Sequence, residues 1–233
     1  MNSIPIEVYL SENFGLDDKH ASIKPIGSGH INTTMLLSTP KRSLVVQKLN
    51  TVVFPKPQLL VDNARLIEQH LSKKQQVGEF NLAIVRHVAT TQHDYLVNNN
   101  DDTWRALEFI GGSYSEDVVN TVSQAQTAAN AFGQFAAALE DFDANKLHAV
   151  IPNFHNLAMR AEVFKQVINT DPHKRVAHCQ EEVDFCLSQF SLIDELNSLE
   201  GKVPIRVCHN DTKINKVCFD LYIIGSLLTV VHL

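Results

Sequence analysis

The chain has 233 residues, of which 44% are hydrophobic and 20% are charged, with both signs mixed along its length. This composition excludes an intrinsically disordered protein and is sufficient for one large domain or for two lobes with cores of their own. The formal net charge of -6 gives no sign of a surface for binding polyanions, so nucleic acid is not expected as the main partner.

Cysteine usage and the lack of a targeting pattern predict a cytoplasmic protein. Cys179, Cys186, Cys208 and Cys218 form no C-x-x-C pair, so we expect buried free thiols in a reducing compartment. Residues 1–15 lack the basic and apolar regions of a signal peptide. The longest apolar run is too short to span a bilayer, so no membrane association is expected.

The first half of the chain mixes strand and helix patterns. Apolar runs at Ile23–Ile26, Ile31–Leu37 and Arg42–Leu49 predict a sheet of consecutive antiparallel strands. Apolar residues at helical spacing then predict a helix over Gln58–Lys73. Further strands are predicted at Asn81–Thr90, Asp94–Asn99 and Thr103–Gly112.

The second half of the chain has mainly helical spacing. Long helices are predicted over Ala128–Phe142 and Val176–Leu196, with a proline-led turn and a shorter helix between them. The predicted fold class is therefore α+β, with a sheet-rich N-terminal lobe over residues 1–112 and a helical C-terminal lobe over residues 113–233. A hinge is expected near Gly111.

A glycine pair between the first two predicted strands could bind phosphate. Gly27 and Gly29 flank Ser28, and glycine permits a positive φ and lets backbone N–H groups approach a phosphate without a Cβ in the way. An ordinary hairpin turn has the same pattern and needs no ligand. No G-K-[ST] sequence follows, and the next element is a strand, so neither a Walker A loop nor a dinucleotide fingerprint is indicated.

Lys48 and Glu68 are candidates for the lysine–glutamate pair of kinase-like sites. Lys48 shares a strand face with Val46, and we expect its ammonium to point under the glycine hairpin at phosphate oxygens. Glu68, on the following helix, could hold that ammonium in position. The alternatives are a solvated lysine at a strand end and an exposed helix carboxylate.

The strongest functional pattern is the loop that contains His209, Asp211 and Asn215, which follows the H-x-D…N order of kinase-type catalytic loops. In such loops the aspartate orients a substrate hydroxyl and accepts its proton, the asparagine binds Mg²⁺, and the histidine braces the loop. The alternative is a polar turn between two strands. The order of glycine hairpin, strand lysine, helix glutamate and H-x-D loop favours a phosphotransferase.

Five segments together resemble the N-acetylhexosamine 1-kinases of the aminoglycoside phosphotransferase and choline-kinase-like superfamily. The resemblance runs in order from about Ile23 to Asp220. It implies a two-lobed protein-kinase-like fold, ATP with Mg²⁺ as the phosphate donor, and the anomeric hydroxyl of an N-acetylhexosamine as the acceptor. The segments are Gly27–Leu37, Val45–Asn63, Arg105–Ser113, Asp141–Asn156 and His209–Asn215.

The resemblance also implies roles for single residues. Asp211 would be the catalytic base, and Lys48 with the Gly27–Gly29 hairpin would bind the triphosphate. Glu108 to Ile110 would form the strand that enters the hinge, where backbone groups meet adenine. The acceptor would lie near candidates from one segment: Asp143, His148, Asn153, Phe154 and His155.

Two departures from the family pattern concern the metal. The kinase asparagine falls five residues after the aspartate, where this chain has Lys216, and Asn215 falls one residue earlier. A lysine has no acceptor atom for Mg²⁺, so only a shift of the loop would let Asn215 serve instead. Leu221–Leu233 contains no Asp or Glu, whereas the family carries a metal-binding aspartate on its next strand.

The sequence therefore leaves three functions open. The first is an active small-molecule kinase. The second is a kinase-fold remnant with an incomplete C-terminal lobe, which binds nucleotide but transfers no phosphate. The third is a binding protein that self-associates through helix faces left uncovered in that lobe, such as those holding Phe132 or Phe190.

Overall fold

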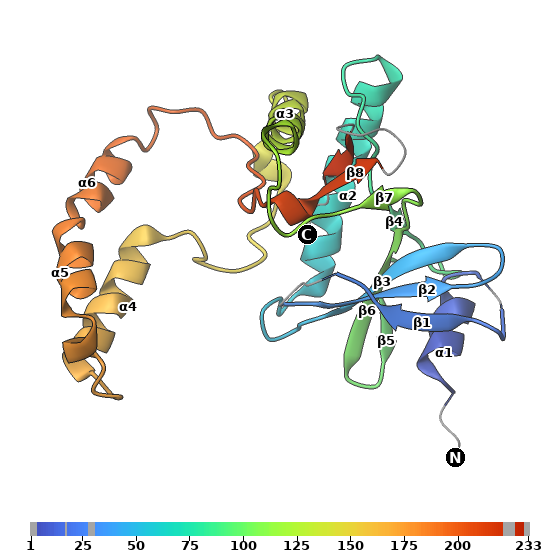
Figure 1. Ribbon diagram of the computed structural model, residues 1–233, viewed down its shortest axis with the longest axis horizontal. Coiled ribbons are helices and arrows are strands. Elements are labelled where there is room, and N and C mark those ends of the chain that lie inside the picture. The colour runs from blue at the N-terminus through green and yellow to red at the C-terminus, as the bar shows by residue number, and fades with distance from the viewer. Residues whose placement is uncertain (1–3, 17, 28–30, 221–226, 231–233) are drawn as a thin grey trace. The chain divides into compact units, whose positions relative to one another are not determined.

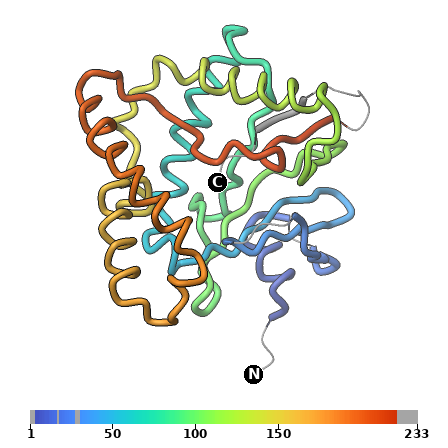
Figure 2. Tube along the Cα trace, turned by 60° about the vertical axis from the view of Figure 1, so that its left-hand side comes forward, coloured from blue at the N-terminus to red at the C-terminus, as the bar shows by residue number. Residues whose placement is uncertain are grey.

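The computed structural model describes residues 4–16, 18–27, 31–220 and 227–230 (Figure 1). The chain forms two compact units, which we call unit 1 (Met1–Val150 with Arg206–Leu233) and unit 2 (Ile151–Ile205). It leaves unit 1 after Val150 and returns to it at Arg206, as the trace in Figure 2 shows. The division at residue 112 that the sequence predicts stays a prediction.

Unit 1 is built on an antiparallel sheet, as the sequence predicts. The three predicted N-terminal strands are confirmed. The third of them, β3 (Ser43–Leu49), pairs with β6 (Asp102–Glu108), so that Gln47 lies opposite Arg105 and Lys48 opposite Trp104. β5 (Val97–Asn99) also pairs with β6. The order across the sheet is β1 (Ser22–Pro25), β2 (Thr33–Ser38), β3 (Ser43–Leu49), β6 (Asp102–Glu108) and β4 (His87–Val88).

One face of this sheet is covered by α1 (Ile6–Asn13), a helix that the sequence analysis missed. Leu10 and Phe14 are fully buried against Val46 and Trp104 from the sheet. Side chains alternate between the two faces of a strand, so Gln47 and Arg105 lie on the opposite face from Val46 and Trp104. Residues of β3 and β6 therefore divide between the face that α1 covers and the opposite face.

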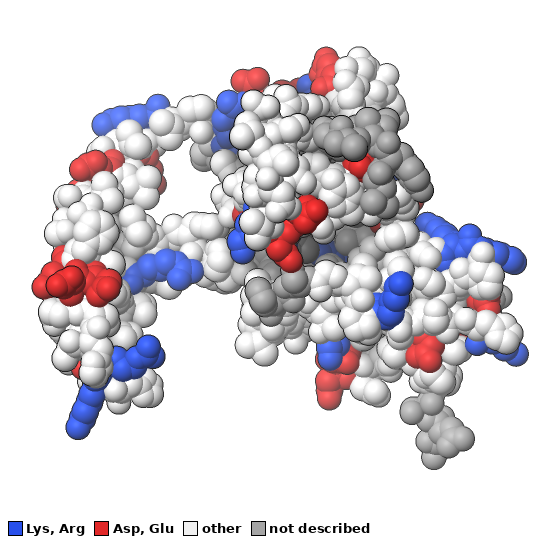
Figure 3. Space-filling model, viewed as in Figure 1, with Lys and Arg blue, Asp and Glu red and all other residues white. Residues whose placement is uncertain are grey.

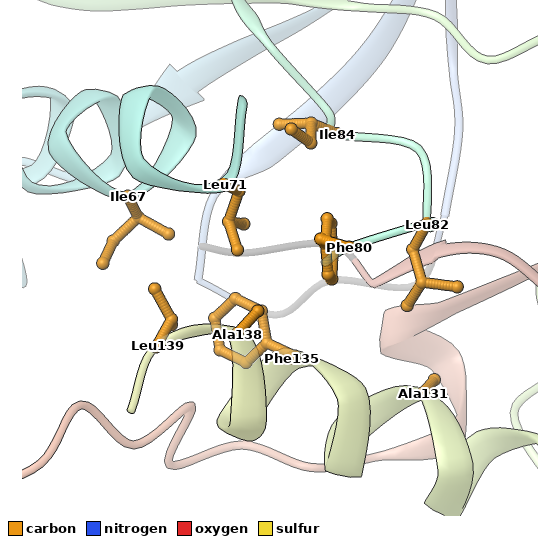
Figure 4. Packing of buried hydrophobic residues seen from close by; sticks show 9 residues of the cluster. All are labelled: Ile67, Leu71, Phe80, Leu82, Ile84, Ala131, Phe135, Ala138 and Leu139. Atoms are coloured by element: carbon orange, nitrogen blue, oxygen red, sulfur yellow. The ribbon is translucent and has the colours of Figure 1, made fainter. Parts of the chain in front are cut away.

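The helices α2 (Pro57–Gln76) and α3 (Val122–Ala138) pack against each other in the main core of unit 1. Helix α2 begins at a proline, which suits the first turn because its missing N–H would have no partner there. Figure 4 shows apolar side chains of both helices meeting those of the segment that follows α2. The buried members are Ile67, Leu71, Phe80, Leu82, Ile84, Ala131, Phe135, Ala138 and Leu139.

The strand predicted over Asn81–Thr90 is mostly wrong, because only His87–Val88 pairs with the sheet. Leu82 and Ile84 alternate as in a strand, but they are buried against α2 and α3 instead of lying on the sheet. The side chain of Gln75 donates a hydrogen bond to the Leu82 carbonyl at 2.7 Å. At Leu82, therefore, a side chain is a partner of the backbone carbonyl.

A second sheet follows the order β7 (Ser113–Tyr114), β8 (Val217–Asp220) and β9 (Leu227–Val230), and its strands are antiparallel. Val217 and Phe219 of β8 are fully buried with Ala128 of α3. This packing holds the segment just before β8 next to α3, and that segment contains the H-x-D motif.

Unit 2 contains α4 (Leu157–Thr170), α5 (Gln180–Ser188) and α6 (Ser191–Ser198). The prediction of a single helix over Val176–Leu196 is wrong. The chain forms two helices there, α5 and α6, and Gln189–Phe190 separates them. There the Ser188 hydroxyl donates to the Phe185 carbonyl at 2.7 Å, and the backbone forms bonds to the third preceding residue. Serine side chains that bind the preceding turn compete with the regular helix pattern in this way.

The α+β fold class is confirmed, and one expectation about the thiols is corrected. The four cysteines are free, but Cys179, Cys186 and Cys208 are exposed instead of buried, and only Cys218 is partly covered. Among the described helices, none has both the length and the apolar character needed to cross a bilayer. The cytoplasmic location stays a prediction.

Replacing Phe135 by alanine is expected to lower the free energy of unfolding by about 3–5 kcal/mol, because the ring is 4% exposed between α2 and α3. Urea unfolding followed by circular dichroism measures this change. Gln134→Ala, on the exposed side of the same helix, is the matched control and should shift the midpoint little. Equal shifts for the two variants would contradict the packing described here.

Candidate functional site

The candidate site is organised around residues 208–216, which we call the Asp211 loop. The imidazole ring of His209 lies edge-on to Phe132 and Phe135 of α3, with ring centroids 5.3 and 5.9 Å apart. The backbone N–H of Asp211 donates to His209 Nδ1 at 3.3 Å. Helix α3 therefore fixes the histidine, and the histidine fixes the backbone of the aspartate. This geometry suits the predicted bracing role of His209.

Asp211 follows a residue with a left-handed backbone conformation. Asn210 has a φ of 61°, a left-handed conformation that asparagine tolerates better than most residues. The Asp211 side chain is 45% exposed, so a substrate hydroxyl can reach it. Lys213 Nζ lies 3.9 Å from its Oδ1, and Lys216 Nζ lies 3.7 Å from its Oδ2. The carboxylate thus lies between two ammonium groups.

The two lysines differ in burial. The side chain of Lys213 is 67% exposed, whereas that of Lys216 is 15% exposed. Burial lowers the pKa of the Lys216 ammonium, and the nearby Asp211 carboxylate opposes this shift. Lys216 ends a short 3₁₀ turn, η3 (Ile214–Lys216), and its backbone N–H donates to the Lys213 carbonyl at 3.0 Å. Its position is therefore fixed by the turn and by the buried residue that follows, Val217.

Asn215, the candidate metal ligand, turns its amide nitrogen toward Asp117. Asn215 Nδ2 donates to Asp117 Oδ1 at 3.1 Å, which ties the Asp211 loop to the segment after β7. Its Oδ1 atom is buried and has no hydrogen-bond partner in the described part of the chain. This oxygen is chemically suited to a cation, but it is a single neutral ligand.

The described residues do not fit a Mg²⁺ ion held by the protein at Asp211. Mg²⁺ takes six oxygen ligands in octahedral geometry, usually including carboxylates. Here the Asp211 carboxylate has two ammonium groups within 4 Å, and a divalent cation on the same oxygens would be repelled by both. No group of three or more His, Cys, Asp or Glu side chains suited to a metal occurs among the residues that the structure describes.

Of the predicted phosphate-binding hairpin, only Gly27 is described; Ser28 and Gly29 lie outside the described residues. Gly27 has a φ of 73°, a left-handed conformation that most side chains avoid. Among the described residues, apart from its chain neighbours, no heavy atom lies within 4 Å of the place where its Cβ would be. Whether this turn binds phosphate stays a prediction.

The predicted Lys48–Glu68 ion pair is wrong. Lys48 Nζ lies 3.5 Å from Asp102 Oδ2, and both side chains are about half exposed. Because Lys48 is opposite Trp104 in the sheet, it belongs to the face that α1 covers. Glu68, on α2, serves the opposite face, so the two side chains do not meet.

Glu68 instead belongs to a buried polar network, which we call the Glu68 network and define as Glu68, His87, Arg105 and Gln47. Glu68 Oε1 accepts from the backbone N–H of His87 at 3.2 Å and from its Nδ1 at 2.5 Å. His87 Nε2 lies 3.2 Å from Arg105 Nη1. Arg105 Nε and Nη2 donate to Gln47 Oε1 at 2.9 and 2.7 Å. The network connects α2 to β4, β6 and β3.

These contacts assign the protonation of His87. Its Nδ1–H donates to Glu68, so Nε2 carries the lone pair that accepts from Arg105, and the imidazole is neutral. Burial lowers the pKa of His87, and the charge of Arg105 lowers it further, against the opposing effect of Glu68. Burial also lowers the pKa of Arg105 to about 10, so its guanidinium stays charged at neutral pH.

The lowered pKa of His87 predicts a loss of stability in acid. The unfolded chain binds the proton near the ordinary value of 6.5, and the folded chain binds it only at lower pH. The stabilising contribution is therefore complete above about pH 6.5 and is lost as the pH falls through the folded pKa. Urea midpoints measured between about pH 7 and pH 5 should fall less steeply for His87→Gln than for the wild type. Parallel curves would contradict the assignment, and exposed His20→Gln serves as the control.

The predicted hinge strand is placed at the end of β6. The backbone N–H of Glu108 donates to the Arg86 carbonyl at 2.9 Å, and the Ile110 carbonyl accepts from Ser113 Oγ at 2.7 Å. Beside this strand lies an open depression of about 420 Å³, lined by residues 39–43 with Glu108, Phe109 and Gly111. Arg42 Nη2 lies 3.9 Å from Glu108 Oε1 at its edge.

The predicted acceptor segment is divided between the two units. In unit 1, Asn63 of α2 fixes the backbone of His148 through two hydrogen bonds, of 2.8 and 2.9 Å. Asp143 accepts from the backbone N–H of Asn145 at 3.2 Å and begins a 3₁₀ turn, η1 (Ala144–Lys146). The other candidates, Asn153, Phe154 and His155, belong to unit 2. Which of these residues contacts an acceptor stays a prediction.

Positive and negative side chains are mixed on the face of the molecule shown in Figure 3. Figure 3 shows Lys and Arg side chains interspersed with Asp and Glu on the face in view, without a broad region of positive charge. The positive charge in the candidate site is local and comes from the lysines beside Asp211. This distribution agrees with a small anionic ligand.

Comparison with known proteins relates the chain to phosphate-transferring enzymes. The model of the phosphotransferase enzyme family matches residues 22–225. The fold is similar to spectinomycin phosphotransferase in complex with ADP and spectinomycin, with 13% identity, a TM-score of 0.59, and 97% of this chain matching 67% of that one. It is also similar to a microcompartment-associated aminopropanol kinase, with 12% identity, a TM-score of 0.61, and 97% of this chain matching 67% of that one.

A third similar structure is an aminoglycoside phosphotransferase from Alicyclobacillus acidocaldarius, with 17% identity, a TM-score of 0.53, and 99% of this chain matching 66% of that one. At these identities the likeness concerns the fold alone, and it agrees with the kinase-like architecture predicted from the sequence. The chain spans about two thirds of the length of these structures.

Proposed function

Because the chain belongs to the phosphotransferase enzyme family, we propose that it transfers a phosphoryl group from ATP to a hydroxyl group of a small molecule. The observation that carries this proposal is the Asp211 loop, where a half-exposed carboxylate is held on a backbone braced by His209 and α3. Spectinomycin phosphotransferase, whose structure contains ADP, supports a nucleotide as the donor.

Asp211 is the proposed catalytic base. It would orient the acceptor hydroxyl toward the terminal phosphate and accept its proton as the new P–O bond forms. The ADP leaving group carries away the electron pair of the bond that breaks. The ammonium groups of Lys213 and Lys216 lie beside Asp211 and would stabilise the negative charge of the transferring group.

The proposed acceptor is an N-acetylhexosamine, phosphorylated at its anomeric hydroxyl. This finer proposal rests on the resemblance of five segments to the N-acetylhexosamine 1-kinases. Within it, Gly27 and the backbone of Glu108 to Ile110 would contact the nucleotide. A coupled ADP-release assay with N-acetylglucosamine and N-acetylgalactosamine tests the acceptor, with spectinomycin and aminopropanol as competing candidates. ADP release with these two compounds alone would refute the sugar assignment.

A second candidate function is nucleotide binding without transfer. The observation that favours it is Lys216, which stands at the position of the metal-binding asparagine and faces Asp211 at 3.7 Å. This function predicts saturable binding of ATP in calorimetry together with no ADP release for any acceptor. Turnover that Asp211→Asn abolishes would exclude it.

Self-association is a further proposal, favoured by exposed apolar side chains on the helices of unit 2. Phe185 of α5 and Leu196 of α6 are 65% and 52% exposed. Phe190, expected to be uncovered, is instead partly buried beside Phe164, with ring centroids 6.3 Å apart. Light scattering of the intact chain should then give a mass above that of a monomer, and Phe185→Ser should lower it. A clean monomer would refute the proposal.

A further inference from the structure

The Asp211 loop carries a lysine where kinase-type loops carry a metal-binding asparagine. In H-x-D-x-x-x-x-N loops the amide oxygen of that asparagine binds one of two magnesium ions. The equivalent residue here is Lys216, which is five positions after Asp211. An ammonium group has three donors and no acceptor, so it binds phosphate oxygens but not a metal ion.

The structure directs this ammonium into the site. The Lys216 side chain is 15% exposed, and its Nζ lies 3.7 Å from Asp211 Oδ2. The next residue, Val217, is completely buried at the start of β8, which fixes the backbone that carries the lysine. Lys216 is therefore not a freely solvated surface lysine.

The charge balance of the loop suits an anion. The Asp211 carboxylate lies within 4 Å of two ammonium groups, those of Lys213 and Lys216. Asn215 turns its amide nitrogen to Asp117. The two ammonium groups favour a polyphosphate beside Asp211 and disfavour a divalent cation there.

We propose that the Lys216 ammonium takes the place of a protein-held Mg²⁺ beside Asp211 and binds the terminal phosphates of a nucleotide, so that nucleotide binding by this chain does not require a divalent cation. This inference rests on the proposed function, because it needs the nucleotide phosphates to lie at the Asp211 loop. It concerns binding, and it adds no step to the transfer reaction.

Calorimetric titration of the full chain with ATP, once with Mg²⁺ and once with EDTA, tests the inference. The wild type should bind ATP with dissociation constants that agree within about threefold in the two buffers. Lys216→Met keeps the length of the side chain and removes its charge, and it should weaken binding in EDTA by about tenfold or more. Lys216→Arg keeps the charge and should retain metal-independent binding.

Lys19→Met, at an exposed lysine outside the loop, is the control for the loss of one positive charge and should leave both constants unchanged. Circular dichroism checks that each variant is folded, and the wild-type comparison between the two buffers needs no variant.

Wild-type binding only with Mg²⁺ would overturn the inference and leave the proposed function standing. So would equal affinities of wild type and Lys216→Met in EDTA. No ATP binding in either buffer would refute the proposed function and the inference together.

Discussion

Replacing Asp211 by asparagine is expected to lower the rate constant for phosphate transfer by about 10²–10⁴-fold, the range that a positioned general base contributes. The amide keeps the size of the side chain but cannot accept the proton of the acceptor hydroxyl. The two lysines beside residue 211 stay in place, so ATP affinity should change little or should increase.

Single-turnover ADP release and calorimetric ATP binding measure these two effects of Asp211→Asn separately. Asp220→Asn is the matched control, because this carboxylate is at the end of β8, outside the Asp211 loop, and should leave the transfer rate unchanged. Equal transfer rates for wild type and Asp211→Asn would show that another group is the base. A loss of ATP binding in Asp211→Asn would show that the carboxylate supports the nucleotide site instead of the transfer.

Replacing Arg105 by leucine is expected to lower the free energy of unfolding by about 3–5 kcal/mol, the range seen when loss of one residue leaves a buried charge uncompensated. Arg105 is completely buried, and its removal leaves Gln47 Oε1 and His87 Nε2 without a donor and Glu68 without a nearby cation. Urea unfolding measures the change.

Lys48→Met is the matched control for Arg105→Leu, because it breaks the exposed pair with Asp102 and should cost at most about 1 kcal/mol. In the double variant Arg105→Leu with Glu68→Gln, the second change should recover part of the loss, since it removes the buried charge that the first change leaves unpaired. If the two variants lost similar amounts of unfolding free energy, this would contradict the complete burial of Arg105 and the exposure of Lys48.

The N-terminal strands and helix α2 could be predicted because their patterns are local. The alternation in Arg42–Leu49 and the helical spacing in Gln58–Lys73 come from burial of one side of each element. Helix α1 has the same kind of signal, since Ile6, Leu10 and Phe14 recur every four residues, and a search for that spacing would have found it. For Leu82 and Ile84 the strand prediction is wrong, because alternation does not say whether the neighbour is a strand or a helix.

The candidate site was predictable where it is contiguous in sequence and not where it is assembled from several elements. His209 and Asp211 are two residues apart, and the structure brings them into contact. The Glu68 network joins four elements, and the sequence predicts Lys48 as the partner of Glu68 because kinase-like sites contain a lysine–glutamate pair. The register of β3 and β6 determines which of these residues joins the network: Gln47 is opposite Arg105 in the sheet, and Lys48 is opposite Trp104. A single arginine within the otherwise uncharged Thr103–Leu107 run was the available signal.

The central claim, that this chain transfers phosphate from ATP to a small-molecule hydroxyl through Asp211, is tested most directly by ³¹P nuclear magnetic resonance of the reaction mixture. With ATP and N-acetylhexosamines, the account predicts a new signal of a phosphate ester at the anomeric carbon together with ADP, and no such signal with Asp211→Asn. Wild-type protein that binds ATP but yields neither a phosphate ester nor ADP with any acceptor would contradict it.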